Sequence, residues 1–472
     1  MRTARSTRDA NLRRRSSRLT ALSLSIMLAG CNALLEVDLP GVVKAEDRNN
    51  PVLATVLING VIGDFECAWS NYTTAGGLLT EWVNGLTNSG VGQGGWMQRD
   101  IPQGDQTIGI GNCLQFYGLY TPLHAARWQS ESAYDLFAGF DQAAVPNKVE
   151  LQGITRAYGG YALLALGEGF CSMAIEGGPE MTRTQVFTLA ETKFTEATTL
   201  LQSLTTPTAT SVLNMARVGR ARIRGDLKNW AGALADAALI PRGFSRMALR
   251  EDVSFERSNK YVRLQNELSA RNGSVADDFR DLRIRADGTP TSYCNGPPCD
   301  GPAGAPMAPG EVADPRVQMN NTGLLNRNNT PFIMHRKYTT YNDDIPLASY
   351  EEAQLYVAEA QAQLGNLQAA ITAINGLRGA PLNLPLYATP TTMTQTQVIK
   401  AVLEERRRLL FQAVNARWND LLRYDGTPNA MPWKGEPGSI HPTGRNAAGQ
   451  LYGNVKCVLL PTVEIIGNPN ID

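Results

Sequence analysis

Residues 350–378 read YEEAQLYVAEAQAQLGNLQAAITAINGLR, and this stretch predicts a pair of antiparallel helices. Small and apolar residues recur at steps of three and four on both sides of Gly365 and Asn366, which is the period of a helix with one buried face. Glycine tolerates the left-handed backbone that ends a helix, and asparagine caps the start of the next one. We therefore expect one helix over 348–364 and a second over 367–377.

The same periodicity recurs upstream and downstream of this pair. Helices are expected over 151–170 and 184–204, over a second pair at 211–223 and 227–239 that turns at Gly225-Asp226, and over a last segment at 397–424. The pairs resemble tetratricopeptide repeats, although they lie too far apart in the sequence to form a tandem array. The predicted fold is mainly α, with helix pairs near 151–239 and 348–424 forming a right-handed superhelix, long irregular loops and few short strands.

The segment 243–345, between the helix pairs, is rich in Gly, Pro, Asn and Arg and shows no regular period. Long irregular stretches in compact proteins are usually functional surface. We expect this insertion to lie on the ligand side of a single domain spanning 51–472.

The first thirty residues are typical of a secretion signal, with an arginine-rich start, a short apolar run and small residues before a cysteine. The apolar run is too short to cross a bilayer, which takes about 20 residues. Leu28-Ala29-Gly30-Cys31 matches the bacterial lipobox, in which Cys31 carries the lipid; an ordinary signal with a chance cysteine is the alternative. Residues 1–30 are then removed, 31–50 form a tether, and the protein is anchored to a membrane by its N-terminal lipid.

Charge and cysteine content narrow the function further. Beyond residue 30 the chain carries 37 basic and 43 acidic side chains, and this mildly acidic balance argues against nucleic-acid binding. Of seven cysteines, six remain after lipidation of Cys31, enough for up to three disulfides whose pairing the sequence leaves open. Cys294 and Cys299 bracket a turn sequence and are the expected pair. A zinc site is disfavoured because no CxxC spacing occurs, and no metal or other cofactor is predicted.

A series of ordered motifs in the C-terminal third resembles the SusD/RagB family of outer-membrane lipoproteins. The motifs are Asp314-Pro315-Arg316, Lys337-Tyr338, the helix 350–360, Glu405-Arg406-Arg407 with 417–423, and Leu460-Pro461 with Asn468-Pro469. Two positions depart from the pattern: residues 413–416 replace the usual Glu-Gly, and Val463 replaces a proline. We interpret Glu405, Arg406, Arg417 and Asp420 as a structural network of charge-assisted hydrogen bonds rather than a catalytic group.

The resemblance implies a non-enzymatic surface receptor that captures a nutrient, most simply a glycan, and hands it to a TonB-dependent (SusC-like) outer-membrane barrel. It implies an outward-facing outer-membrane location and a peptide as a second possible ligand, but it transfers no ligand residue. Because sugar C–H faces rest on aromatic rings, the aromatics in loop-like sequence are the candidates for a binding platform. They are Trp69, Tyr72, Trp82 and Trp96, with Tyr293 in second rank, and core packing is the competing interpretation for each.

Two other classes of function remain open. A glycan-degrading enzyme would need two facing carboxylates about 5–10 Å apart, and no motif marks such a pair. A scaffold of an envelope complex would use the helix pairs to dock proteins and would bind no small ligand.

Overall fold

The structure is a computed structural model that describes residues 47–83, 93–104, 113, 118–265, 271, 273–293, 300, 304–446 and 448–471. Residues Pro51–Asp472 form one compact unit. The predicted signal peptide, the lipidation residue Cys31 and the predicted pair Cys294/Cys299 lie outside the described residues.

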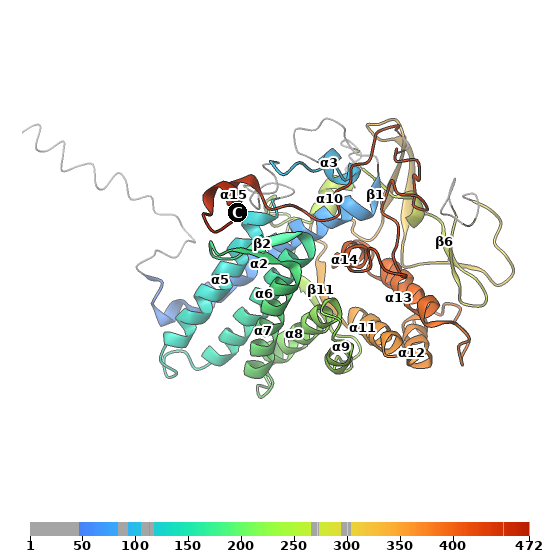
Figure 1. The fold of residues 1–472 in the computed structure, drawn as a ribbon. Helices are drawn as coiled ribbons and strands as arrows, with labels where there is room; N and C mark the ends of the chain where they lie inside the picture. The colour runs from blue at the N-terminus through green and yellow to red at the C-terminus, as the bar shows by residue number, and fades with distance from the viewer. Residues whose placement is uncertain are drawn as a thin grey trace, which may run out of the picture. The chain divides into compact units, whose positions relative to one another are not determined.

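The described chain is mainly helical, as predicted. The helices α5 to α9 and α11 to α13 pack side by side in succession (Figure 1). Helix α9 packs directly on α11, although the strands β4 to β11 lie between them in the sequence. The handedness of a superhelix remains a prediction. The helices are η2 Pro51–Leu53, α2 Ala54–Thr80, α3 Gln93–Gln98, α5 Tyr120–Gly139, α6 Lys148–Gly169, α7 Arg183–Leu201, α8 Pro207–Asp226, α9 Trp230–Ala237, α10 Lys260–Gln265, η3 Asp277–Phe279, α11 Tyr350–Gln363, α12 Leu367–Arg378, α13 Gln395–Leu409, α14 Ala416–Arg423 and α15 Thr462–Gly467.

Short antiparallel strands supply the remaining regular structure, most of them in the segment expected to be irregular. The pairs are β1 with β5, β2 with β3, β4 with β11 and β9 with β10, and β6 pairs with both β7 and β8. The strands are β1 Trp82–Val83, β2 Ser172–Ala174, β3 Glu180–Thr182, β4 Ser245–Ala248, β5 Ser274–Val275, β6 Leu282–Ile284, β7 Pro290–Ser292, β8 Val312–Ala313, β9 Met319–Leu325, β10 Pro331–His335 and β11 Ile345–Ser349.

The long helix α2 corrects the interpretation of the sequence around Trp69 and Tyr72 as loop-like. Every residue from Phe65 to Thr80 is buried, so this half of α2 is a core helix covered on all sides. A helix buried all round shows no polar face and therefore no amphipathic period, which is why the pattern was missed. By length and composition residues Pro51–Thr80 would also suffice to cross a membrane, but burial of this kind is what a core helix shows.

The two predicted helix pairs are present, with a correction at one turn. In the second pair Gly365 has a φ of 85° and separates α11 from α12. In the first pair α8 continues through Gly225 and Asp226. The left-handed residue there is Lys228, at a φ of 60°, and the side chain of Asn229 caps α9. The turn therefore lies two to three residues later than glycine preference alone indicates.

The predicted helix 397–424 is wrong as a single element, because it breaks between α13 and α14. Gln412 and Asn415 both adopt positive φ in the break, at 48° and 62°. Side chains distant in the sequence hold the carbonyls that the break exposes: Tyr338 donates to Gln412 O at 2.7 Å, and Arg222 donates to Val414 O at 2.7 Å. Tyr338 belongs to the Lys-Tyr motif, so that motif fixes the start of α14.

Two buried ion networks attach α13 to the rest of the fold. Glu405 accepts from Arg316 at 2.6 Å and from Arg378 at 2.5 Å, and Arg316 also binds Asp314. On a different face of the helix, Arg406 donates to Asp420 at 3.0 Å, to Glu359 at 2.6 Å and to a backbone carbonyl. Arg423 binds the same two carboxylates. The C-terminal motifs, far apart in sequence, thus converge on one helix.

Two disulfides join described residues. Cys67 in α2 is bonded to Cys113, and Cys171 after α6 is bonded to Cys457 in the C-terminal tail. The second bridge spans 286 residues of sequence and closes the tail onto the helical half of the fold.

Candidate functional site

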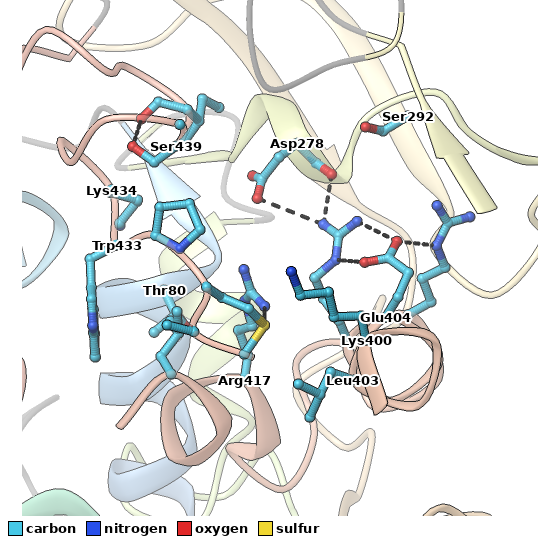
Figure 2. Close-up of a pocket in the computed structure, with 18 of the residues that line it drawn as sticks. Thr80, Asp278, Ser292, Lys400, Leu403, Glu404, Arg417, Trp433, Lys434 and Ser439 are labelled. Carbon is cyan, nitrogen blue, oxygen red and sulfur yellow. Dashed lines mark hydrogen bonds and ion pairs between the residues drawn. The ribbon is translucent and has the colours of Figure 1, made fainter. Parts of the chain in front are cut away.

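A cavity of about 420 Å³ opens beside α13 and α14. Its other walls are the C-terminal end of α2, the segment of η3 and β7, and the loop 430–440 (Figure 2). The volume falls within the roughly 300–1,000 Å³ typical of small-molecule sites. It is therefore large enough to hold part of a ligand such as a short oligosaccharide.

One face of α13 forms the floor of the cavity. Lys400, Leu403, Glu404 and Arg407 line it, and their spacing of three, four and seven residues puts them on one side of a helix. The intervening residues Glu405 and Arg406, described above, point into the buried networks. One side of α13 thus lines the cavity, and another side holds the helix in the fold.

Glu404 is held between two arginines. Arg407 donates to both of its carboxylate oxygens at 2.7 and 2.8 Å, and Arg408 donates to it at 2.6 Å. Burial alone would raise the pKa of Glu404, but the two guanidinium groups outweigh burial and hold that pKa well below its usual range. Arg407 also donates to the backbone carbonyl of Asp278 at 2.7 Å, which joins the floor to the opposite wall.

The loop 430–440 closes the far side. Lys434 donates to Leu78 O at 3.1 Å and to Met97 O at 3.2 Å, so it anchors the loop to the end of α2. Burial lowers the pKa of Lys434 to about 7. Beside it, Trp433 borders the cavity with 1% of its surface exposed and with Arg99 5.1 Å from its ring centroid. Trp433 therefore offers little ring surface to the cavity.

Arg417 corrects one sequence prediction. It was expected to join Glu405, Arg406 and Asp420, yet no carboxylate lies within ion-pair distance of it among the described residues. Arg423, on the next turn of α14, takes the expected place beside Asp420. Arg417 instead turns into the cavity, where its guanidinium approaches the sulfur of Met431 at 2.7 Å (Figure 2).

Three of the predicted platform aromatics lie in the core, and the prediction is wrong for them. Trp69, Tyr72 and Trp96 are each 0% exposed. The indole of Trp69 donates to Pro346 O at 3.0 Å, and the hydroxyl of Tyr72 donates to Glu168 at 2.5 Å. They are buried because α2 and α3 pack inside the fold, where large aromatic rings contribute most to stability.

The other two predicted binding residues, Trp82 and Tyr293, are not among the described residues that line the cavity. Trp82 is in β1 and pairs with Val275, and its side chain lies outside what the structure describes. Tyr293 is half-buried just beyond β7, with its hydroxyl 3.1 Å from Glu311 and its ring 4.1 Å from the Arg283 guanidinium. A ligand role for these two residues remains a prediction.

The sequence did contain a signal for the floor of the cavity. The run Glu404-Glu405-Arg406-Arg407-Arg408 places three basic residues directly after two acids, and Lys400 stands one turn before it. Plotting these charges on a helix separates two faces that both carry charge, which is unusual for a helix with one buried side. Within the described ranges no cluster of three or more His, Cys, Asp or Glu is arranged to hold a metal ion.

Comparison with known proteins agrees with this fold. Residues 306–453 match the sequence model of the SusD family. No curated protein sequence matches the chain.

Solved structures extend the likeness to nearly the whole chain. A SusD-like protein from Bacteroides fragilis has a TM-score of 0.62 at 10% identity, covering 93% of this chain and 99% of that chain. A SusD homolog from Bacteroides thetaiotaomicron has a TM-score of 0.62 at 13% identity, covering 91% and 98%. A SusD-like carbohydrate binding protein from Bacteroides vulgatus has a TM-score of 0.59 at 14% identity, covering 89% and 97%. At such identities the structures establish the fold, and the match to the SusD family model is carried by residues 306–453.

Proposed function

We propose that this protein is a lipid-anchored, non-enzymatic receptor on the cell surface that captures a glycan and delivers it to a TonB-dependent outer-membrane transporter. The observation that carries the proposal is the polar cavity between α13, α14, η3 and the loop 430–440, on a SusD fold. Relatives with this fold include proteins described as carbohydrate binding.

The chemistry of the cavity wall suits a ligand rich in hydroxyl groups. Saccharide hydroxyls need both acceptors and donors, because a buried polar group without a partner costs about 1–3 kcal/mol. Asp278 keeps 18% of its side chain exposed at the wall, and its carboxylate receives only a long ion pair of 3.7 Å from Arg407. Ser292 and Lys400 add donors from β7 and α13 (Figure 2).

The same groups favour binding over hydrolysis. A glycosidase needs one carboxyl protonated as a general acid, with a raised pKa. Glu404 has a lowered pKa and is neutralised by two arginines. Both oxygens of Glu404 accept from arginines, so Glu404 and Asp278 do not form the facing acid and base pair that hydrolysis needs.

The anchor and the partner are proposed from sequence. The lipobox at residues 28–31 supports a lipid at Cys31, and the resemblance to SusD/RagB lipoproteins supports an outer-membrane barrel as recipient. Purification of the tagged protein from its own membranes would test this: we expect a TonB-dependent barrel to copurify, and recovery without one would contradict the delivery step.

Calorimetric titration tests the capture step. The full-length protein, purified in detergent with its disulfides formed, is titrated with a panel of oligosaccharides and peptides. We expect binding heat with one saccharide class, weakened at least about fivefold in D278N, which removes one charged acceptor from the wall. The control D135N changes an exposed aspartate on α5 and is expected to leave affinity unchanged. Silence with every saccharide for folded protein would contradict glycan capture and favour a scaffold.

A further inference from the structure

Two positively charged side chains from different helices converge in the cavity. Lys400 reaches in from α13 and Arg417 from α14, and Figure 2 shows both charged ends pointing into the space below Asp278. Lys400 is exposed and Arg417 is half-buried. Like charges brought together repel one another, and the repulsion is relieved when an anion lies between them.

Within the described chain, neither group has a carboxylate within ion-pair distance. The other arginines of the two helices do: Arg406 and Arg423 bind Asp420, while Arg407 and Arg408 bind Glu404. Arg417 is thus the exception on these helices, with the sulfur of Met431 as its hydrogen-bond acceptor. A thioether is a weak acceptor, so the guanidinium keeps most of its hydrogen-bonding capacity unused.

Desolvation makes the arrangement unfavourable without a ligand. Burial, and next the neighbouring Arg407, lower the pKa of Arg417. Arg417 is half-buried and has no carboxylate within ion-pair distance among the described residues, so an incoming carboxylate would gain a direct ion pair with it, and the planar fork of donors fits a carboxylate in a bidentate geometry. Among the cavity-lining residues that the structure describes, five side chains are basic and three acidic, so the lining as a whole also favours an anion.

We propose that the cavity selects an acidic saccharide, binding its carboxylate between Arg417 and Lys400 and its hydroxyls at Asp278 and Ser292. The inference rests on the proposed glycan capture and adds the class of glycan. One sugar that carries both a carboxylate and hydroxyls would bind the two cations and the two hydroxyl-binding side chains at the same time. A bare anion would engage the two cations but would leave the Asp278 carboxylate facing it with the same charge.

The test compares one acidic ligand with its neutral counterpart. Full-length protein in detergent is titrated with an oligogalacturonide, with the same oligosaccharide after reduction of its carboxyl groups to alcohols, and with inorganic phosphate. We expect the acidic form to bind at least about tenfold more tightly than the reduced form, with an affinity that falls as salt is added. Phosphate is expected to bind more weakly than the oligogalacturonide.

Charge variants identify the groups responsible. K400Q removes an exposed charge that no described contact uses, so it is expected to fold normally and to reduce the preference for the acidic form about tenfold. R417K keeps the charge but loses the bidentate fork, and we expect an intermediate loss. The control K228Q removes an exposed charge in the turn between α8 and α9 and should change nothing.

The outcomes separate this inference from the function beneath it. Equal affinity for the acidic and reduced saccharides, unchanged in K400Q, would overturn acidic selection while leaving glycan capture intact. Phosphate binding as tight as oligogalacturonide binding would overturn the saccharide assignment. Binding of neither oligosaccharide, with another neutral glycan bound, would again overturn the inference alone, and silence with all saccharides would overturn both proposals.

Discussion

The buried arginine of α8 gives the most direct test of how the fold is held together. Arg222 is 0% exposed and donates to Glu168 of α6 at 2.6 and 2.5 Å, to Glu352 of α11 at 3.2 Å and to Val414 O at 2.7 Å. The hydroxyl of Tyr72 in α2 donates to the same Glu168. One guanidinium therefore connects α6, α8, α11 and the break before α14.

We expect R222M to destabilise the protein strongly. Methionine fills much of the space, but Glu168 and Glu352 are left facing each other in the core without a cation. Removing one partner of a buried ion pair costs about 3–5 kcal/mol, because the remaining charge stays desolvated. Near neutral pH the free energy of unfolding should fall by about that amount.

The pH dependence distinguishes this mechanism from loss of packing. Burial raises the pKa of Glu352 to about 7 even with Arg222 present, so the folded state binds more protons than the unfolded state between the ordinary carboxyl pKa and about 7. The stability that protonation of Glu352 contributes to the folded state is present at low pH and is lost as the pH rises through about 7. Without Arg222, whose charge lowers the pKa of Glu352, that pKa is expected to rise further, so Glu352 takes up its proton at a higher pH in the variant than in the native chain. The penalty of R222M should therefore shrink by up to about 1.4 kcal/mol between about pH 8 and about pH 5.

Urea unfolding followed by circular dichroism at the two pH values measures this penalty. The matched control is E352Q, which imitates the protonated carboxyl; we expect a cost below about 1 kcal/mol and a flatter pH dependence than the native chain. A penalty for R222M below about 1 kcal/mol at both pH values, or one that grows toward low pH, would refute the reasoning.

Three further predictions concern the core and its cross-links. Replacing Cys171 and Cys457 by serine opens a bridge across 286 residues and should lower the unfolding free energy by about 5 kcal/mol in urea titrations. Trp69→Ala should cost about 3–5 kcal/mol because the ring is fully buried, and a stable variant with weakened ligand binding would instead favour the platform interpretation. Gly76→Ala would place its Cβ 1.7 Å from a side-chain atom and should lower Tm sharply, whereas Gly60→Ala has nothing within 4 Å and should be neutral or stabilising by about 0.5–1 kcal/mol.

The sequence predicted those parts of the fold whose signal is local. Amphipathic helices show a period of three to four residues in their apolar positions. This period predicts α6, α7 and both helix pairs to within a few residues. The first half of the chain was misread because α2 is buried on all sides and shows no polar face. The break between α13 and α14 was missed for another reason: the carbonyls it exposes are held by Tyr338 and Arg222, which are distant in sequence.

The candidate site is less predictable from sequence, because exposure decides which rings and charges are available to a ligand. Aromatic residues were chosen by residue type, and Trp69, Tyr72 and Trp96 proved to be core. Arg417 was assigned to a structural network by motif alone, while the geometry gives that place to Arg423. Sequence supplied the correct helix but not the direction in which each side chain points.

The arrangement of α13 separates the side chains that hold the fold together from those that line the cavity. Glu405 and Arg406 bind the buried networks that position the helix, and neither tolerates loss without exposing a partner charge to the core. Lys400 lies one turn earlier on the cavity face, is exposed, and has no ion pair among the described residues. Substitution at Lys400 therefore costs little folding energy but changes the charge that a ligand meets. Because the two faces of one helix are energetically separate, the charge at the proposed site can change while the residues that hold the fold stay fixed.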